Sequence, residues 1–214
     1  KRKEKKMKIG FFSGKGGVGK TTLAFNIAKI LNAYIVSNDV WSKIDKIYPQ
    51  AEIVDDLKDV DKRWDDNHTL IYDFAGHLDT SILDIIPNCD IVFFVTTANI
   101  LSIGGANTLI SEVAKLCQSD KIILANMHGL KGEKYSRANF DMDKQNVDKL
   151  SDKYQIDIEY IRYSKPLEDS IQKNKSIIEL ANTALLKRNW MEPISQIEKI
   201  TNYIKTKENK NGQL

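Results

Sequence analysis

The stretch from Gly14 to Thr21 constrains the fold of this chain more than any other part of its sequence. It reads Gly-Lys-Gly-Gly-Val-Gly-Lys-Thr, a complete GxxxxGK(S/T) pattern. The apolar run 7–13 before it predicts a buried strand, and the segment 20–32 after it carries apolar residues at helical spacing. A strand, a glycine-rich turn and a helix in this order form the phosphate-binding unit of P-loop proteins. The pattern therefore predicts a site for a nucleoside triphosphate.

Each residue type in this loop suits bound Mg-ATP. Glycines let backbone N–H groups curl around phosphate oxygens, and the start of the helix adds its positive dipole end. Lys20 is expected to reach the β- and γ-phosphates, and the Thr21 hydroxyl is expected to bind Mg²⁺. The residues predicted to contact the nucleotide here are Gly14, Lys15, Gly16, Gly17, Val18, Gly19, Lys20, Thr21 and Thr22.

Strand and helix signals alternate along the rest of the chain. Beyond 7–13, strands are predicted at 33–37, 70–73, 91–96, 121–126 and 158–163. Beyond 20–32, helices are predicted at 101–118, 141–154, about 166–173, 175–187 and 192–206, with short helices inside 41–66 and a polar loop at 129–140. Apolar strands separated by helices predict a P-loop three-layer α/β/α sandwich with a mostly parallel sheet.

Composition adds few constraints. The 214 residues are 42% apolar and 29% charged with a net charge of +3, which is ordinary for one globular domain and does not by itself imply a polyanionic partner. We expect a single domain at 7–214, preceded by a basic segment 1–6 that is either a solvated tail, an artificial extension, or an arm touching nucleic acid or lipid. No secretory leader pattern or membrane-spanning apolar run is present, so a cytoplasmic location is expected.

Cysteine and histidine usage does not indicate a metal or disulfide framework. Cys89 and Cys117 are 28 residues apart in unrelated contexts, and we expect both to be buried, inert thiols. His68, His77 and His128 lack metal-ligand spacing, although His77 follows a candidate phosphate-sensing segment.

Lys15 and Thr22 make the loop resemble a particular variant. The string Lys-Gly-Gly-Val-Gly-Lys-Thr-Thr at 15–22 is similar to the deviant P-loop of the ParA/MinD family of ATPases, which segregate plasmids and chromosomes or place the division site. In that family the early lysine crosses an ATP-sandwich dimer and contacts the partner's phosphates. The resemblance implies this role for Lys15.

Two further segments resemble the family's switch regions. The family's pattern Asp-x-Asp-Pro-Gln corresponds to Ser-Asn-Asp-Val-Trp at 37–41, so the first acid is replaced by Ser37 and the second is kept as Asp39. The resemblance implies that Asp39 helps to hold the Mg²⁺ shell and the attacking water. In the second segment, Asp73 would bind Mg²⁺ through water and Gly76 would sense the γ-phosphate, unless the two are only a strand-end acid and a turn glycine.

Asn126 is the candidate for reading the base. It ends a predicted strand where the family usually has an asparagine that contacts adenine, and a carboxamide can accept and donate hydrogen bonds at once. The alternative is an asparagine that only caps the strand end. A later stretch, 163–178, also resembles the family but carries the least specific signal.

The resemblance implies a ParA-like ATPase of the short class. It would form an ATP-dependent homodimer, bind DNA non-specifically on the nucleoid, and drive plasmid or chromosome partition with hydrolysis stimulated by a small centromere-binding partner. Hydrolysis would be slow without that partner. Two alternatives stay open: a MinD-like ATPase positioned at a membrane or pole, and a nucleotide-binding switch with weak hydrolysis, since Ser37 and Phe74 depart from the family pattern. The C-terminal helix lacks large terminal hydrophobic residues, so we expect it to pack on the domain and not on lipid.

Overall fold

The computed structural model describes residues 6–64, 67–76, 80–128, 137–183 and 190–211. Within these residues seven strands form one sheet in the order β3-β2-β4-β1-β5-β6-β7, and every neighbouring pair is parallel. The strands are β1 (Lys8–Phe12), β2 (Tyr34–Ser37), β3 (Ala51–Ile53), β4 (Leu70–Asp73), β5 (Ile91–Thr96), β6 (Asp120–His128) and β7 (Asp157–Arg162). The predicted sheet is therefore confirmed, and it is parallel throughout.

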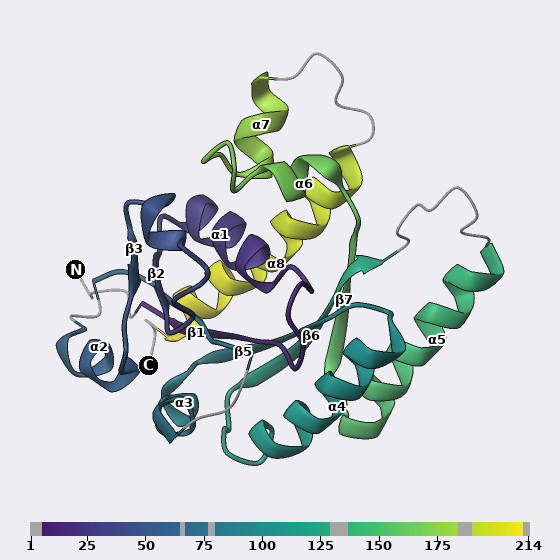
Figure 1. Cartoon of the computed structure of the whole chain (residues 1–214), viewed down its shortest axis with the longest axis horizontal. Helices are drawn as coiled ribbons and strands as arrows, with labels where there is room; N and C mark the ends of the chain where they lie inside the picture. The colour runs from purple at the N-terminus through teal and green to yellow at the C-terminus, as the bar shows by residue number, and fades with distance from the viewer. Residues whose placement is uncertain (1–5, 65–66, 77–79, 129–136, 184–189, 212–214) are drawn as a thin grey trace.

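Helices connect successive strands and cover both faces of the sheet. They are α1 (Lys20–Leu31), α2 (Leu57–Arg63), α3 (Thr80–Ile85), α4 (Ile100–Val113), α5 (Arg137–Tyr154), α6 (Lys165–Asp169), α7 (Ile177–Thr183) and α8 (Met191–Asn211), with 3₁₀ turns η1 (Ile44–Lys46) and η2 (Ile86–Asn88). Figure 1 shows α1, α6, α7 and α8 on one side of the sheet and α3, α4 and α5 on the other. This is the predicted three-layer sandwich.

The two layers are held by separate apolar clusters on the two faces of the sheet. Along β5, Phe93 points into the cluster under α1 and α8, whereas Phe94 points into the cluster under α3, α4 and α5. Because neighbouring side chains of a strand point to opposite faces, a strand that is apolar throughout contributes to both clusters. This explains why the predicted strands were continuous apolar runs.

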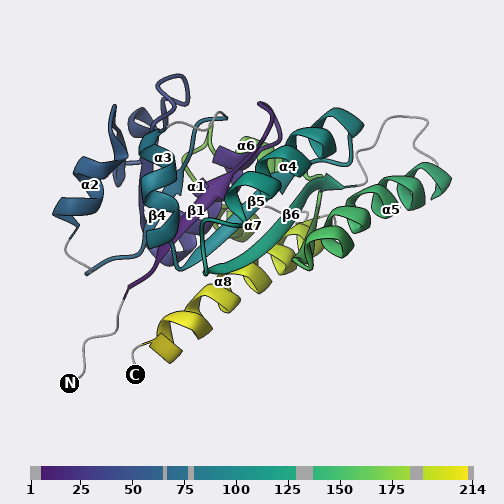
Figure 2. The ribbon, with the colours of Figure 1, turned by 90° about the horizontal axis from the view of Figure 1, so that it is seen from below.

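Helix α8 closes the first layer. Its apolar side chains Ile197, Ile200 and Ile204 are buried in the cluster under α1, which confirms the expected packing of this helix on the domain. Figure 2 shows α8 running obliquely along the sheet, with its C-terminal end on the same side of the molecule as the N-terminus. Its far end is tied to the residue before β4 through a buried contact in which the Thr69 hydroxyl donates to the Glu208 carboxylate.

Several boundaries differ from the sequence-based predictions. The stretch 41–66 contains a short parallel strand, β3, as well as helices, and α3 was not predicted. Helix α5 begins at Arg137, so the end of the predicted loop 129–140 is helical, and 129–136 lie outside the described residues. The described part of the predicted helix 175–187 is α7, which ends at Thr183. No helix in the described part of the chain combines the length and apolar character needed to cross a membrane.

Candidate nucleotide-binding site

The loop between β1 and α1 has the conformation that its glycines allow. Gly17 and Gly19 have φ angles of 78° and 83°, in the left-handed region that other residues adopt only with strain. Gly19 is also the N-cap of α1, and no side chain caps the first turn of this helix. Backbone N–H groups at the start of α1 are therefore left for an anion, as the sequence predicts for a phosphate loop.

The start of the loop packs against α4 through backbone atoms alone. A Cβ atom on Gly14 would lie 2.2 Å from the Gly105 carbonyl oxygen, and a Cβ atom on Gly105 would lie 2.7 Å from the Gly14 carbonyl oxygen. Only glycine fits at either position, because real Cβ atoms do not approach backbone so closely. Sequence reasoning missed Gly105, although a glycine pair inside a helical pattern is a signal for such a close approach.

Lys20, Thr21 and Asp73 meet at the carboxyl edge of the sheet. Asp73 ends β4 beside β1, where it pairs in register with Phe11, and its side chain is fully buried. One carboxylate oxygen is ion-paired with the Lys20 ammonium, and the other accepts a hydrogen bond of 2.7 Å from the Thr21 hydroxyl. The structure therefore brings together three residues that sequence reasoning assigned to phosphate and metal binding.

The chemistry of these side chains fits Mg²⁺. The Thr21 hydroxyl and the Asp73 carboxylate supply oxygen ligands, which Mg²⁺ prefers, and the described residues contain no group of three or more His, Cys, Asp or Glu side chains that could cage a metal. A site with few protein oxygens suits an ion that also binds water and substrate phosphates. Thr21 and Asp73 are thus the residues that would hold it.

The two segments that resemble switch regions are hydrogen-bonded to each other. The Ser37 hydroxyl, which is buried, donates to the Asp73 carbonyl oxygen at 2.9 Å and accepts from the Asp39 N–H at 3.1 Å. The Asn38 side-chain oxygen accepts a hydrogen bond of 2.7 Å from the Ala75 N–H. The hydroxyl that replaces the family's first acid therefore has a structural role that couples the ends of β2 and β4.

Asp39 does not reach the cluster of Lys20, Thr21 and Asp73 in this conformation. Its side-chain oxygen instead accepts a hydrogen bond of 3.0 Å from the Trp41 N–H, and its carbonyl oxygen accepts from the Ser42 N–H at 3.0 Å. Asp39 is half-buried, so part of its side chain is exposed to solvent.

Gly76 and Lys15 lie on the exposed side of the site. A Cβ atom on Gly76 would meet only the Ser13 carbonyl oxygen, at 3.9 Å, so the glycine lies beside the beginning of the phosphate loop. Before it, Phe74 is fully buried and stacks on Phe12 with ring centroids 4.1 Å apart, which anchors the segment to β1. Lys15 is exposed and has no ion-pair partner among the described residues. His77 and the side chain of His128 lie outside the described residues.

Asn126 lines a small pocket behind the loop. Its side-chain NH₂ donates to the Val18 carbonyl oxygen at 2.7 Å, while its oxygen is buried without a hydrogen-bond partner among the described residues. The β6–β7 ladder shifts register between Ala125 and His128, so Asn126 sits at a bulge of the kind that re-aims side chains beside functional sites.

The other residues of this pocket come from α1 and from the segment after β7. The buried Ser164 hydroxyl also has no hydrogen-bond partner among the described residues, and the Tyr163 hydroxyl donates to the Glu168 carboxylate at 3.1 Å. This hydrogen bond to Glu168 raises the pKa of Tyr163. The pocket, of about 30 Å³, is lined by Thr22, Asn126, Tyr163, Ser164, Leu167 and Glu168. Sequence reasoning found Asn126 but not Ser164 or Glu168, which come from the least specific stretch.

The two cysteines lie away from this chemistry. Both are buried, as expected, and burial raises the pKa of the Cys89 thiol, which keeps it in its unreactive protonated form.

Solved structures with the same architecture come from ATPases. No protein-family model matches the sequence, and no curated protein matches it either. A ParA family ATPase from Chlorobium tepidum is 15% identical, with a TM-score of 0.52 over 87% of this chain and 96% of that one. MinD from Pyrococcus horikoshii, complexed with Mg-ADP, is 13% identical, with a TM-score of 0.60 over 91% and 96%.

A third similar structure comes from a protein of Borrelia burgdorferi assigned to plasmid partition and bound to AMPPNP. It is 17% identical, with a TM-score of 0.59 over 92% of this chain and 98% of that one. Likeness at such identities shows the fold and not the activity. The chain has the P-loop α/β fold of the ParA and MinD ATPases.

Proposed function

We propose that this protein is an ATPase of the ParA/MinD type that binds Mg-ATP at the loop 14–21. The observation that carries this proposal is the cluster in which Lys20 and Thr21 share the buried carboxylate of Asp73. It sits at the carboxyl edge of a parallel sheet, next to a helix start without a side-chain cap. Proteins with the same fold bind Mg-ADP and AMPPNP.

Nucleotide binding then exchanges the partners within this cluster. The Lys20 ammonium leaves Asp73 for the β- and γ-phosphates, which carry more negative charge than one carboxylate. Thr21, and Asp73 through water, would hold Mg²⁺, which would neutralise charge on the phosphates when it is bound. Gly76 presents its N–H to the γ-phosphate. Asp39 gives up the Trp41 N–H and orients the attacking water.

The base lies in the pocket beside Asn126. The unpartnered Asn126 oxygen accepts from the adenine amino group, and that is the group in which adenine differs from guanine. A volume of about 30 Å³ holds little more than a water molecule, so the segment 163–168 moves outward when the base enters.

Triphosphate binding closes a homodimer. Two triphosphates that face each other bring many negative charges together, and Lys15 is an exposed cation with no ion-pair partner among the described residues. In the dimer it contacts the partner's phosphates. Lys15, Lys20 and Asp39 together form the catalytic set.

The ATP-bound dimer binds DNA non-specifically and partitions a plasmid or chromosome. This role comes from the resemblance of the phosphate loop and the switch segments to the ParA/MinD family, and one protein with the same fold is assigned to plasmid partition. A centromere-binding partner stimulates an otherwise slow hydrolysis and releases the dimer from the nucleoid. DNA affinity should fall steeply with salt, because binding rests on phosphate contacts.

The alternatives are weighed on this chain's own residues, because a MinD structure is as similar in fold as the partition protein. For a MinD-like membrane role, the apolar face of α8 is already buried in the core and is not free to insert into lipid. For a switch with weak hydrolysis, Ser37 replaces an acid but keeps the two switch segments joined.

The test of the proposal is a nucleotide-binding and turnover experiment. Calorimetry with ATP, ADP and GTP measures affinity, and phosphate release measures turnover with and without DNA. We expect ATP to bind with Mg²⁺ and to be hydrolysed, and Lys20→Ala to abolish binding because it removes the charge that faces the β- and γ-phosphates. Unchanged ATP affinity in Lys20→Ala would refute the site.

A further inference from the structure

Two pairs of exposed apolar side chains flank the phosphate loop. Among the described large hydrophobic residues the three most exposed are Trp41, Ile100 and Leu101, at 85%, 77% and 68%, and Val40 is 55% exposed. Val40 and Trp41, here called the Trp41 pair, follow β2. Ile100 and Leu101, here called the Leu101 pair, begin α4 after β5.

The sheet order puts these pairs on opposite sides of the site. The end of β1 carries the phosphate loop; β5 is its neighbour on one side, and β2 lies on the other side beyond β4. All strands are parallel, so both pairs lie at the same carboxyl edge as Lys15. A surface that covers the nucleotide site must therefore meet both pairs.

Both pairs are fixed relative to the site. The Trp41 N–H donates to the Asp39 carboxylate at 3.0 Å. The Leu101 N–H donates to the Asn99 side chain at 2.9 Å, and α4 abuts the phosphate loop through Gly105. Exposed aromatic and aliphatic anchors beside a cation that has no ion-pair partner among the described residues are typical of protein interfaces and costly for a free surface.

We infer that the Trp41 pair and the Leu101 pair are buried against a second copy of this chain when triphosphate is bound. This inference rests on the dimer of the proposed function and names the residues that supply the apolar part of the dimer interface. A flat second copy can cover both sides of the loop at once, which a small ligand bound at the loop cannot do. Trp41 alone offers about 200 Å² of surface, a sizeable part of the roughly 800 Å² per partner that a standard interface buries.

The contact is coupled to the nucleotide through Asp39. In this conformation the Asp39 carboxylate holds the Trp41 turn. When Asp39 turns to the site, the Trp41 pair is freed to adjust its position. The same side chain thus orients water and sets the apolar contact, so the second copy docks only on the triphosphate form.

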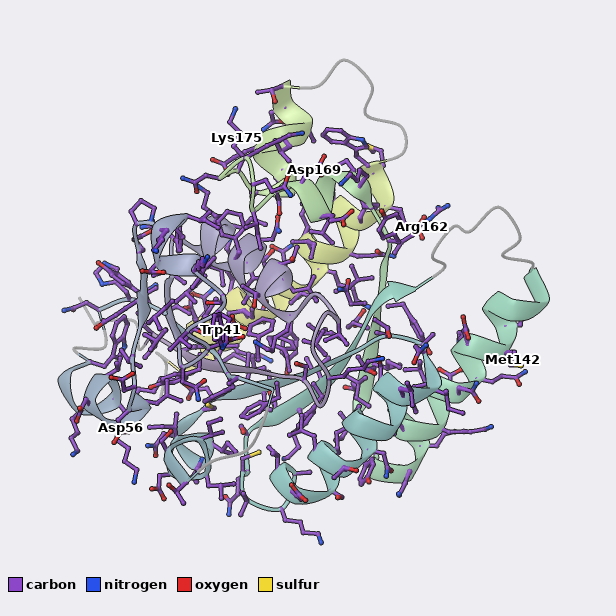
Figure 3. The ribbon with its side chains drawn as sticks, viewed as in Figure 1. Trp41, Asp56, Met142, Arg162, Asp169 and Lys175 are labelled. Carbon is purple, nitrogen blue, oxygen red and sulfur yellow. The ribbon has the colours of Figure 1, made fainter. Side chains whose placement is uncertain are left out.

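Dimerisation of charged variants tests the inference. Light scattering with AMPPNP and Mg²⁺ is measured for wild type, Trp41→Glu, Leu101→Glu and the control Met142→Glu. Met142 is 56% exposed on α5, and Figure 3 shows it well away from Trp41. We expect Trp41→Glu and Leu101→Glu to weaken dimerisation at least about tenfold, since each places a charge among apolar anchors. Met142→Glu should dimerise as wild type does, and nucleotide affinity of all monomers should stay within about twofold.

Fluorescence of Trp41 separates a second copy from a local change. With AMPPNP the Trp41 emission should shift to the blue in wild type. It should not shift in Lys15→Ala, which we expect to bind nucleotide without dimerising. The shift should also be absent in Trp41→Phe. A shift of equal size in monomeric Lys15→Ala would show that Trp41 folds over its own nucleotide and would overturn the inference.

Other outcomes are distinguishable. If wild type dimerises and both charged variants dimerise equally well, the apolar contacts are wrong while the proposed function stands. Loss of partner-stimulated hydrolysis in Trp41→Glu with full dimerisation would assign the pairs to the partner protein and overturn the inference. If wild type binds AMPPNP yet stays monomeric, the proposed dimer fails, and the inference fails with it.

Discussion

The Lys20 ammonium is ion-paired with the buried Asp73 carboxylate, so the residue expected to bind phosphate is neutralised by the residue expected to hold the metal. Charged groups this deeply buried are stable only with a partner, and each therefore positions the other for its later role. In the proposed function Lys20 would turn to the phosphates of ATP, and Asp73 would help to hold Mg²⁺. Binding of nucleotide and metal should consequently be coupled through Asp73.

Asp73→Asn tests this coupling. With Mg²⁺ present, ATP affinity should fall by about tenfold or more, because the metal loses the carboxylate that would hold it through water. With EDTA, the variant should bind ATP at least as tightly as wild type, because Lys20 is free and one negative charge beside the triphosphate is gone. Calorimetry under both conditions provides the measurement. An equal loss of affinity with and without Mg²⁺ would mean that Asp73 supports the loop only structurally.

Gly105 and Gly104 form a matched pair for testing the contact between α4 and the phosphate loop. Gly105→Ala places a Cβ atom 2.7 Å from the Gly14 carbonyl oxygen, whereas a Cβ atom on Gly104 meets nothing within 4 Å. Gly105→Ala should lower the free energy of unfolding by about 1–3 kcal/mol and weaken ATP binding, since the backbone must shift. Gly104→Ala should raise the free energy of unfolding by up to about 1 kcal/mol, because alanine has a higher helix propensity than glycine. Urea denaturation measures the free energy of unfolding of both variants. If the two variants are equally stable, the close contact between Gly105 and Gly14 does not exclude a Cβ atom.

Asn126 should set the choice of base. Asn126→Ala removes the hydrogen bond to the Val18 carbonyl oxygen, and this loss should weaken ATP and GTP alike. The difference between the binding free energies of ATP and GTP should also shrink by about 1–2 kcal/mol, the scale of a buried hydrogen-bonded pair. Calorimetry with both nucleotides on both proteins measures this difference. Equal affinity of wild type for ATP and GTP would leave Asn126 with its structural role alone.

Much of the fold was predictable because most elements carry a strong local pattern. The core strand β5 matches its predicted bounds, since six consecutive apolar or β-branched residues allow only a strand buried on both faces. Strand β3 was missed because its three residues are too few for periodicity and are held by pairing with β2. Helix α3 was missed for a related reason, since six residues span less than two helical turns.

The candidate site was predictable where it is contiguous in sequence. The phosphate loop is one string, and Asp73 follows a readable strand. Gly105 and Ser164 could not be placed, because their roles arise from contacts with residues far away in the chain. For Asp39 the position in the site was predictable from the sequence, but its contact was not. The hydrogen bond that its carboxylate accepts from the Trp41 N–H depends on the turn that follows.

Lys15 gives the sharpest test of the proposed dimer. Unlike Lys20, which is buried and ion-paired, Lys15 is exposed with no ion-pair partner among the described residues, so nothing in the described structure explains its charge. Within one monomer Lys20 already faces the phosphates, and Lys15→Ala or Lys15→Gln should keep most ATP affinity. Across a dimer each Lys15 offsets repulsion between two triphosphates, so the same variants should lose dimerisation with AMPPNP.

The loss should extend to every step that needs the dimer. ATP-dependent DNA binding and stimulated hydrolysis should disappear together with dimerisation in Lys15→Ala, while calorimetry still detects ATP on the monomer. Lys15→Arg should also fail, because a planar guanidinium does not replace a compact ammonium between two phosphate groups. Light scattering with ADP and with AMPPNP is the direct measurement, and Lys149→Ala, which removes an exposed lysine on α5, serves as the control. Because Lys15 is the only cation that this loop adds beyond Lys20, a Lys15 variant that dimerises as readily as wild type would show that the two active sites do not face each other.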